Sequence, residues 1–233
     1  YDFYLYTFEG VDQMTGQSLY KANLRDNYMK DASGNVIGNP EGSDITENVT
    51  TINGKHYVHK TTYAQKEFHG SAMPKIQGSF TPSIQYKSLA LNAVLTYSLG
   101  GKIYHGDKVS LLSQGSLGSG WSVDMLDRWT PENKNTDVPR LTTQPQSSWT
   151  QASSRFLVDR SYLRLKNITF SYTLPKSALK FLTLKDASVF FQAENMLTFT
   201  KEQGLDPEQT FGGATYYRYP TMKTISFGFN VKL

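Results

Sequence analysis

Residues 89–99 read LALNAVLTYSL, and this stretch gives the clearest indication of the fold class. Apolar side chains occupy every odd-numbered position, and polar ones occupy most of the positions between them. An alternation of period two is typical of a β-strand with one apolar face, because successive side chains point to opposite sides. Residues 75–86, KIQGSFTPSIQY, alternate in the same way. Only Lys87 and Ser88 separate the two stretches, so we predict a long β-hairpin with a two-residue turn.

Three more alternating stretches follow in the last third of the chain, at residues 162–174, 186–199 and 221–233. Within residues 162–174 the apolar positions change from odd to even numbers, which predicts a β-bulge near Lys166 and Asn167. We expect one face of these strands to be apolar. The other face is expected to be polar, with residues that include Gln77, Ser79, Thr81, Gln85, Thr224, Ser226 and Asn230.

Strand length and loop length favour a transmembrane barrel over a soluble β-sandwich, which also alternates apolar with polar residues. The stretches run to about 11–14 residues, against a usual 5–6, and a tilted membrane strand needs roughly 9–11. Connections are short at residues 87–88 and 175–185 but long and polar over 106–155, an asymmetry typical of outer-membrane barrels. Aromatic girdles are also expected at the strand ends, where the chain has Tyr86, Tyr97, Tyr104, Tyr172, Tyr217 and Tyr219.

Composition excludes several other classes. Aromatic residues make up 13% of the 233 residues and charged residues 19%, and no run of about 18 apolar residues exists, so a helical membrane protein is excluded. The net charge of +4 is mild and the basic residues are not clustered in the sequence, which argues against a nucleic-acid partner. The absence of cysteine excludes disulfide scaffolds, thiolate metal sites and cysteine nucleophiles.

The number of strands indicates a part of a barrel. A lipid-exposed sheet has to close on itself, and the smallest closed barrels have about eight strands. About five strands are convincing here, with one or two more near residues 1–8 and 55–62. The chain also opens on Tyr1 and not on methionine. We therefore expect residues 1–233 to be one section of a larger barrel.

Several motifs occur in a characteristic order. The most specific is RWTPENKNTDVPR at residues 128–140, and shorter ones lie at residues 10–16, 74–75, 161–169, 194–200 and 204–208. Together they resemble the C-terminal portion of the SusC/RagA-type TonB-linked (TonB-dependent) outer-membrane transporters, whose matching segment reads RWTPENPNTDIPR. Lys134 and the pair Gln13-Met14 depart from the family pattern.

The resemblance implies an all-β fold: the C-terminal strands of a large antiparallel transmembrane β-barrel with short periplasmic turns and long extracellular loops. Residues 1–233 would be the C-terminal part of this barrel, with the plug domain and the earlier strands missing upstream. It implies a bacterial outer-membrane nutrient importer of the Bacteroidota, which takes up glycans or peptides. The implied partners are outer-membrane lipid, a SusD-like surface lipoprotein, and the TonB complex acting through the missing N-terminal region.

Three tryptophans are the candidate substrate-binding residues. Trp121, Trp129 and Trp149 all lie in the predicted extracellular segment over residues 106–155. Aromatic faces can stack on sugar rings, but packing of the loop or contact with the lipoprotein would explain them as well. Trp129 belongs to the motif at residues 128–140, which favours a structural role.

No enzymatic activity, cofactor or metal site is predicted. The glycine-rich residues 115–120 lack the lysine of a phosphate-binding loop, and the four histidines have no metal-binding spacing. Asp159, Arg160 and Arg164 are expected to form ion pairs or to face the lumen. The alternative function is a secreted β-sandwich that binds glycans. A glycoside hydrolase using a pair of carboxylates from Glu132, Asp137 and Glu208 is a third alternative.

Overall fold

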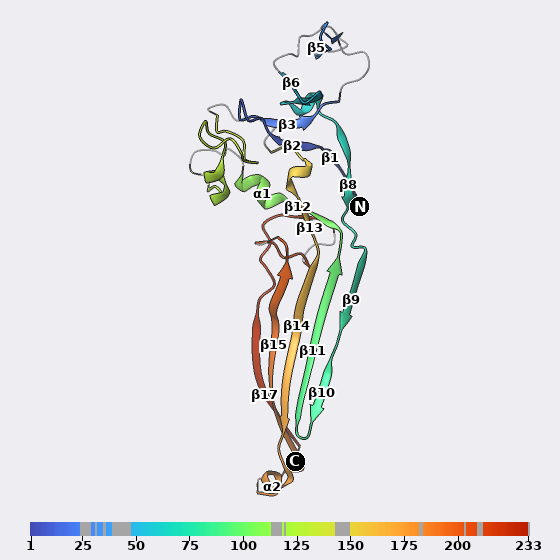
Figure 1. Cartoon of the computed structure of the whole chain (residues 1–233). Coiled ribbons are helices and arrows are strands. Elements are labelled where there is room, and N and C mark those ends of the chain that lie inside the picture. Colours follow the sequence, from blue (N-terminus) through green and yellow to red (C-terminus); the bar gives the residue numbers. More distant parts are fainter. Residues whose placement is uncertain are drawn as a thin grey trace. The chain divides into compact units, whose positions relative to one another are not determined.

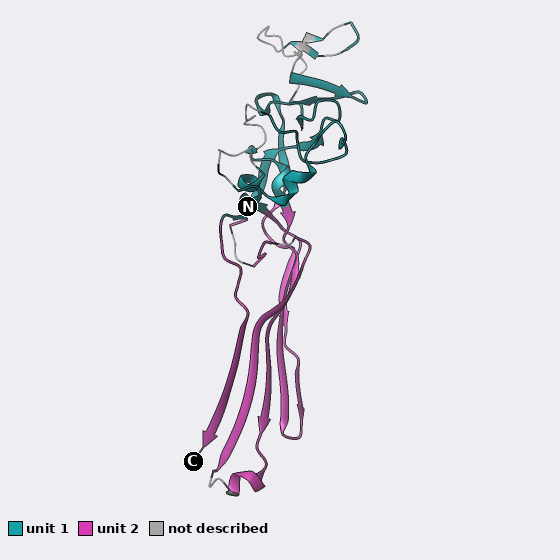
Figure 2. Ribbon diagram, turned by 90° about the vertical axis from the view of Figure 1, so that its left-hand side faces the viewer, with its two compact units in different colours: residues 1–70, 104–157, 214–216 teal, residues 71–103, 158–213, 217–233 magenta. Residues whose placement is uncertain are grey.

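The computed structural model describes residues 1–23, 29–30, 32–34, 36–38, 48–112, 118, 120–142, 150–181, 184–202, 204–208 and 212–232. The chain forms two compact units (Figure 2). Unit 1 comprises residues 1–70, 104–157 and 214–216, and unit 2 comprises residues 71–103, 158–213 and 217–233. None of the helices in the described part is long and apolar enough to span a membrane.

Unit 2 is built on one antiparallel sheet (Figure 1). Its strands are β9 (Ile76–Phe80), β10 (Ser83–Tyr86), β11 (Leu89–Leu99), β14 (Tyr162–Thr173), β15 (Asp186–Thr200) and β17 (Thr224–Lys232). Their order is β10-β11-β14-β15-β17, and β9 also pairs with β11. The short helix α2 (Lys176–Phe181) lies in the connection from β14 to β15. The mostly antiparallel architecture agrees with the predicted fold class.

The predicted hairpin is confirmed, with one correction. Tyr86 pairs with Leu89, so Lys87 and Ser88 are the whole turn. Lys87 has a φ of 53°, and a positive φ at the first central position is typical of two-residue hairpin turns. The single strand predicted over residues 75–86 is divided into β9 and β10. The division falls at Pro82, which has no N–H to donate to the ladder.

The predicted bulge is confirmed at Lys166. Leu165 pairs with Leu95 and Asn167 pairs with Val94, which leaves Lys166 unpaired with β11. The pairing of β14 with β15 shifts between the same two residues, Leu165 and Asn167. Because the extra residue reverses the alternation, the apolar side chains before and after it stay on one face of the sheet.

The two faces of the sheet differ in chemistry, although Val94 and Phe190 lie on the otherwise polar face. One apolar row consists of Ile84, Leu91, Phe170, Phe191 and Phe227. The adjacent row, on the opposite face, consists of Ser83, Asn92, Thr169, Gln192 and Ser226. The apolar row is largely exposed in the structure, with Phe227 at 79%. A sandwich would bury this face against a second sheet, whereas a membrane barrel presents it to lipid.

Unit 1 contains shorter elements. Its strands include β1 (Asp2–Tyr6) paired with β8 (Lys66–Ser71), β4 (Met29–Lys30) paired with β5 (Val36–Gly38), and the sheet of β2 (Phe8–Val11), β3 (Ser18–Lys21), β7 (Lys55–Val58) and β6 (Val49–Ile52). The remaining elements of the chain are β12 (Lys102–His105), β13 (Leu157–Asp159), β16 (Ala214–Thr215), α1 (Gly106–Leu111), and the 3-10 turns at Thr61–Tyr63, Val123–Asp127 and Ser154–Phe156. Strands expected near residues 1–8 and 55–62 are therefore present, and they belong to the sheets of unit 1.

The core of unit 1 has two clusters of buried side chains. The larger cluster contains Tyr104, Leu112, Met125, Val138 and Phe156. The smaller cluster contains Tyr20, Val58 and Ala64. The larger one includes Met125, which lies in the 3-10 turn at Val123–Asp127. The Ser122 hydroxyl accepts the Asp124 N–H at 3.2 Å and caps this turn.

Candidate functional site

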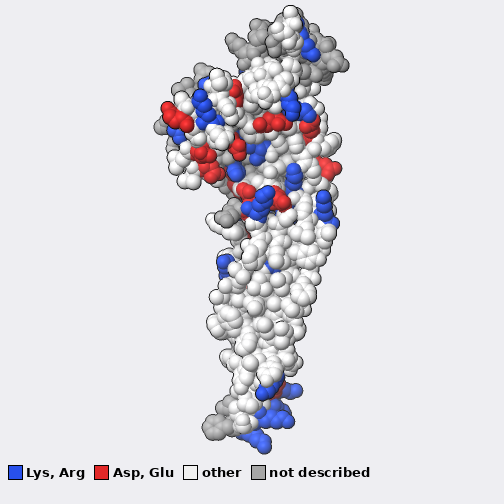
Figure 3. Space-filling model, in the orientation of Figure 1, with Lys and Arg blue, Asp and Glu red and all other residues white. Residues whose placement is uncertain are grey.

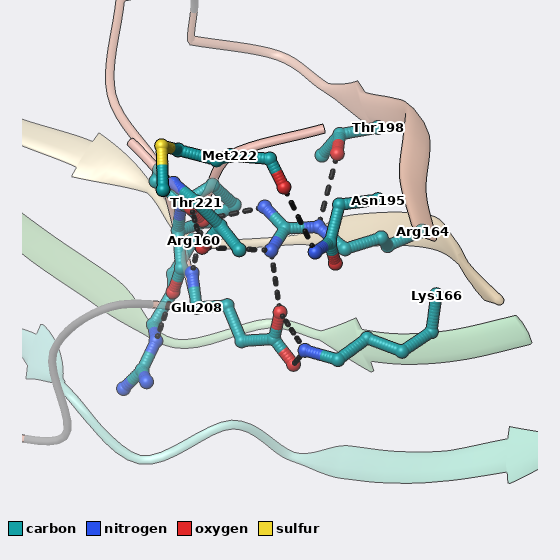
Figure 4. A network of polar contacts seen from close by, with 10 residues as sticks. Arg160, Arg164, Lys166, Asn195, Thr198, Glu208, Thr221 and Met222 are labelled. Carbon is teal, nitrogen blue, oxygen red and sulfur yellow. Dashed lines mark hydrogen bonds and ion pairs between the residues drawn. The ribbon is translucent and has the colours of Figure 1, made fainter. Parts of the chain in front are cut away.

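A network of charged side chains surrounds Arg164 in unit 2 (Figure 4). Arg164 lies on β14, and its side chain is only 4% exposed. The guanidinium donates to Asp206 and Glu208, each at 2.5 Å, and its Nε donates to the Thr198 hydroxyl at 2.9 Å. Hydrogen bonds between ionised partners are roughly twice as strong as neutral ones. Arg164 therefore attaches the connection after β15 to the wall of the sheet.

Asp206 is the most fully bonded carboxylate of the network. Its Oδ2 accepts the Thr221 hydroxyl at 2.6 Å and the Thr221 N–H at 3.0 Å, and its Oδ1 accepts the Glu208 N–H at 3.1 Å. Burial raises the pKa of Asp206, but the hydrogen bonds from Thr221, Arg164 and Glu208 outweigh burial and lower this pKa to about 2. Asp206 is therefore ionised at neutral pH, as its pairing with Arg164 requires.

Further contacts hold the same connection at other points. The Lys166 ammonium donates to Glu208 at 2.9 Å, so the bulge residue joins the network. Arg160 donates from Nε to the Pro207 carbonyl and from Nη1 to the Ala72 carbonyl, both at 3.1 Å. Asn195, on β15, donates to the Met222 carbonyl at 3.1 Å. The segment between β15 and β17 is therefore fixed near both of its ends.

A cleft of about 610 Å³ adjoins this network. Its lining includes Arg164, Asn195, Thr198, Phe199, Asp206 and Thr221. The volume falls within the usual range for ligand pockets, roughly 300–1,000 Å³. The Arg164 and Asp206 charges in this lining are already paired with each other, so the remaining lining consists of hydroxyl, amide and aromatic groups together with the charged side chains of Glu202 and Lys223.

Trp129 has a packing role in unit 1. Its backbone N–H donates to the Val138 carbonyl at 2.8 Å, and its indole Nε1 donates to the Gln13 carbonyl at 3.2 Å. A Cβ placed on Gly16 would lie 2.5 Å from the indole ring, so only glycine fits there. The Arg140 N–H donates to the Gly16 carbonyl at 2.8 Å. The motifs at residues 10–16 and 128–140 are therefore in direct contact.

The other two tryptophans differ from Trp129. Trp121 is 46% exposed and precedes the cap residue Ser122, so its indole is accessible in the structure. Trp149 and residues 115–117 and 119 lie outside the described residues. A substrate contact remains a prediction for Trp121 and Trp129.

A second cavity, of about 320 Å³, lies in unit 1. It combines the carboxylates of Asp124, Asp127 and Asp137 with Arg155. The Arg155 guanidinium lies over the rings of Phe8 and Phe156, and burial lowers its pKa. Among the described residues, no group of three or more His, Asp or Glu side chains is arranged to hold a metal ion.

Sequence patterns do not identify the connection after β15 as the partner of Arg164. They predict an ion pair or a lumen-facing position for Arg164, and the ion pair is present. The available signal was that the motifs at residues 161–169 and 204–208 both contain charged residues, Arg164 in one and Asp206 and Glu208 in the other. Their separation of 42 residues, from Arg164 to Asp206, hides the pairing from any local pattern.

Both the sequence and the fold were compared with known proteins. No protein-family model matches the chain. TonB-dependent receptor P3 of Formosa agariphila is 33% identical over 180 residues, which cover 72% of this chain. TonB-dependent receptor P26 of the same organism is 27% identical over 173 residues, which cover 70%. The chain spans only 17% of the length of either of these curated relatives.

Solved structures give the same result over almost the whole chain. The RagAB peptide importer in its 'closed-closed' state matches 98% of this chain with a TM-score of 0.70 and 28% identity. The RagAB peptide transporter matches 99% of it with the same TM-score and identity. In both cases the match covers 22% of the other chain. These relatives are described as receptors and transporters, and none of them as an enzyme.

Proposed function

This chain belongs to the TonB-dependent receptor family, and from that premise we propose that it forms part of the barrel wall of an outer-membrane nutrient importer. The observation that supports this role is the two-faced sheet of unit 2. Most side chains on one face are apolar, chiefly leucine, isoleucine and phenylalanine, and most on the other are polar, chiefly serine, threonine, asparagine and glutamine.

The length of the strands suits this role. β11 has 11 residues, so it runs for about 34 Å at 3.4 Å per residue. A tilt of about 40°, usual for barrel strands, reduces its height to about 26 Å. The apolar band of outer-membrane barrels is about 25 Å tall. The apolar face of β11 thus matches one crossing of the membrane.

We further propose that residues 1–233 are the C-terminal part of the barrel, with the plug domain upstream. Import would draw energy from the TonB complex, which acts on the upstream region. No catalytic step is assigned to this chain. The long connections would lie outside the cell, beneath a SusD-like lipoprotein, and the short turns would face the periplasm.

The substrate is proposed to be a peptide or an oligosaccharide. The likeness to a peptide importer favours peptides, and the exposed indole of Trp121 suits either, because aromatic faces pack on sugar rings and on apolar side chains. The alternative, a secreted β-sandwich that binds glycans, is less well supported. It would need a second sheet to cover Phe227 and its row, which are exposed in the described chain.

Uptake by cells tests the proposal. The gene for the complete receptor is deleted in the source bacterium, and uptake of fluorescent oligopeptides and of oligosaccharides is measured before and after complementation. We expect one class to be lost on deletion and restored on complementation, and a proton uncoupler to abolish that uptake. Recovery of the complete protein in the soluble fraction without detergent would contradict the proposal.

A further inference from the structure

The net charge of the chain is concentrated at one end of the unit 2 sheet. We name this the turn end: it contains the β10–β11 turn, helix α2 and the last residues of β17. Its five basic residues, the turn-end lysines, are Lys87, Lys176, Lys180, Lys185 and Lys232. Its one acidic residue is Asp186. The chain has 24 basic and 20 acidic residues in all, so 19 of each remain elsewhere and cancel. The turn end therefore accounts for the whole net charge of +4.

All five side chains are free to meet a partner. Each is exposed, and within the described part of the chain none of them forms an ion pair. The nearest carboxylate by register is Asp186, opposite Lys232, and it does not pair with that ammonium. The Lys87 ammonium lies 5.3 Å from the centre of the Tyr86 ring. Figure 3 shows basic side chains gathered at the lower end of the molecule in that view, below a broad uncharged surface.

An exposed apolar row of the sheet lies close to the turn-end lysines. This row consists of Tyr86, Leu89, Tyr172, Val189 and Phe229, all of them exposed. Tyrosines are enriched where the hydrocarbon layer meets the headgroups. Lys87 adjoins Tyr86 in the chain, and Lys232 lies three residues after Phe229, or about 10 Å along the strand. All five turn-end lysines therefore lie beyond this row along the chain, on the side where the headgroups are expected.

We propose that the turn-end lysines bind the phosphate groups of anionic phospholipids in the membrane leaflet at this end of the barrel. The inference rests on the proposed membrane role of the sheet. A long aliphatic stem lets lysine cover apolar surface while its ammonium reaches the headgroups. Each lysine near an anionic bilayer surface strengthens association about fivefold. A row of lysines beside an aromatic edge fits a lipid surface better than it fits a protein partner, whose site would include an apolar pocket.

The test uses the complete receptor reconstituted in vesicles of equal parts phosphatidylcholine and phosphatidylglycerol. The lipids that stay bound after extraction are counted by native mass spectrometry. The test variant is K87Q/K176Q/K180Q/K185Q/K232Q. The control variant removes the same charge from exposed lysines outside the turn end: K55Q/K60Q/K102Q/K134Q/K201Q. If the test variant fails to insert, K176Q/K180Q in α2, outside the strands, makes the same comparison.

We expect the wild type and the control variant to retain phosphatidylglycerol over phosphatidylcholine by roughly tenfold, and the test variant to lose most of this preference. High salt should weaken the preference, because exposed charges are screened. Equal lipid retention by wild type and test variant overturns the inference, as does an equal loss in the control. Capture of a periplasmic protein that depends on these lysines, without a lipid preference, also overturns it. A wild type that does not insert into these vesicles refutes the proposed function itself.

Discussion

The Arg164 side chain is buried, so protein groups and not water have to compensate its charge. Asp206, Glu208 and Thr198 supply them, at 2.5–2.9 Å. A buried ion pair adds little net stability over an apolar replacement, but removal of one partner leaves an uncompensated charge and costs about 3–5 kcal/mol. This asymmetry makes the network sensitive to single substitutions.

Arg164→Met should release the connection between β15 and β17. The substitution leaves Asp206 buried without its cation, which lowers the free energy of local opening of the connection by about 3 kcal/mol. This decrease corresponds to roughly 100-fold faster cleavage of residues 201–223. Limited proteolysis of the complete receptor, followed by mass spectrometry, measures the rate. Lys201→Gln, an exposed charge in the same connection, is the control and should cleave at the wild-type rate. Equal rates for Arg164→Met and wild type would refute the stabilising role of Arg164.

Asp206 should also make the connection sensitive to acid. Its pKa is about 2 in the folded chain, below the ordinary 3.8. Ionised Asp206 therefore stabilises the folded connection by about 2 kcal/mol. This stabilisation is complete well above pH 3.8 and is lost as the pH falls toward 2. Pepsin digestion between pH 5 and pH 2 measures this opening. Asp206→Asn cannot titrate, so its cleavage should depend less on pH, and a wild-type profile as flat as that of the variant would count against the expectation.

At the scale of elements, the sheet of unit 2 depends on strict alternation, which is interrupted at two places for different reasons. Pro82 divides the first strand because it lacks a donor, while Lys166 bulges and reverses the alternation. Tyr97 packs over Gly78 on the neighbouring strand, where a Cβ would lie 2.8 Å from the tyrosine hydroxyl. An aromatic ring over a strand glycine helps to fix the register.

Charge should be tolerated on one face of β17 and not on the other. Phe227→Arg places a cation in the apolar row, which destabilises a membrane barrel by about 2–4 kcal/mol at mid-membrane depth. Ser226→Arg places the cation on the polar face instead. Leu95→Arg should behave like Phe227→Arg. The amount of heat-modifiable barrel in the outer-membrane fraction reports assembly. Equal yields for positions 226 and 227 would contradict the assignment of the two faces.

Deletion of Lys166 should be far more harmful than its substitution. Without the extra residue, either Arg164 or Phe170 has to move to the wrong face, because a one-residue slip reverses every side chain. Lys166→Ala only removes a half-exposed ion pair with Glu208, worth at most about 1 kcal/mol. The same assembly assay should show little barrel for the deletion and near wild-type amounts for the substitution. Normal assembly of the deletion would refute the bulge.

At the scale of the whole molecule, contacts between distant segments define unit 1. The Trp129 indole donates to the carbonyl of Gln13, 116 residues away in the chain. Gly16 beside it has a φ of 71° and no room for a Cβ. The exposed loop residue Gly54 has a similar φ of 76° with nothing within 4 Å of its Cβ position. A comparison of alanine substitutions at these two glycines therefore separates the energetic cost of backbone strain from that of a steric clash.

Gly16→Ala should therefore destabilise the complete receptor more than Gly54→Ala does. Both substitutions strain a left-handed backbone, at about 1 kcal/mol, and only Gly16→Ala also forces Trp129 to move, which adds about 1–3 kcal/mol. Thermal unfolding, with proteolysis of residues 128–140 as the local measurement, compares the two. Equal melting temperatures would show that the packing of Trp129 on Gly16 has little energetic weight.

The amino-acid sequence alone predicts the strands of the unit 2 sheet, their faces, the two-residue turn and the bulge, because each depends on neighbours within a few residues. The ordered motifs, read in the sequence, also indicate the family. The contacts of Arg164 with Asp206 and of Trp129 with Gly16 become apparent only in the folded chain. Alternation predicts which face a side chain occupies. Which loop contacts the side chain there depends on packing between segments far apart in the chain, and local periodicity contains no information about that packing.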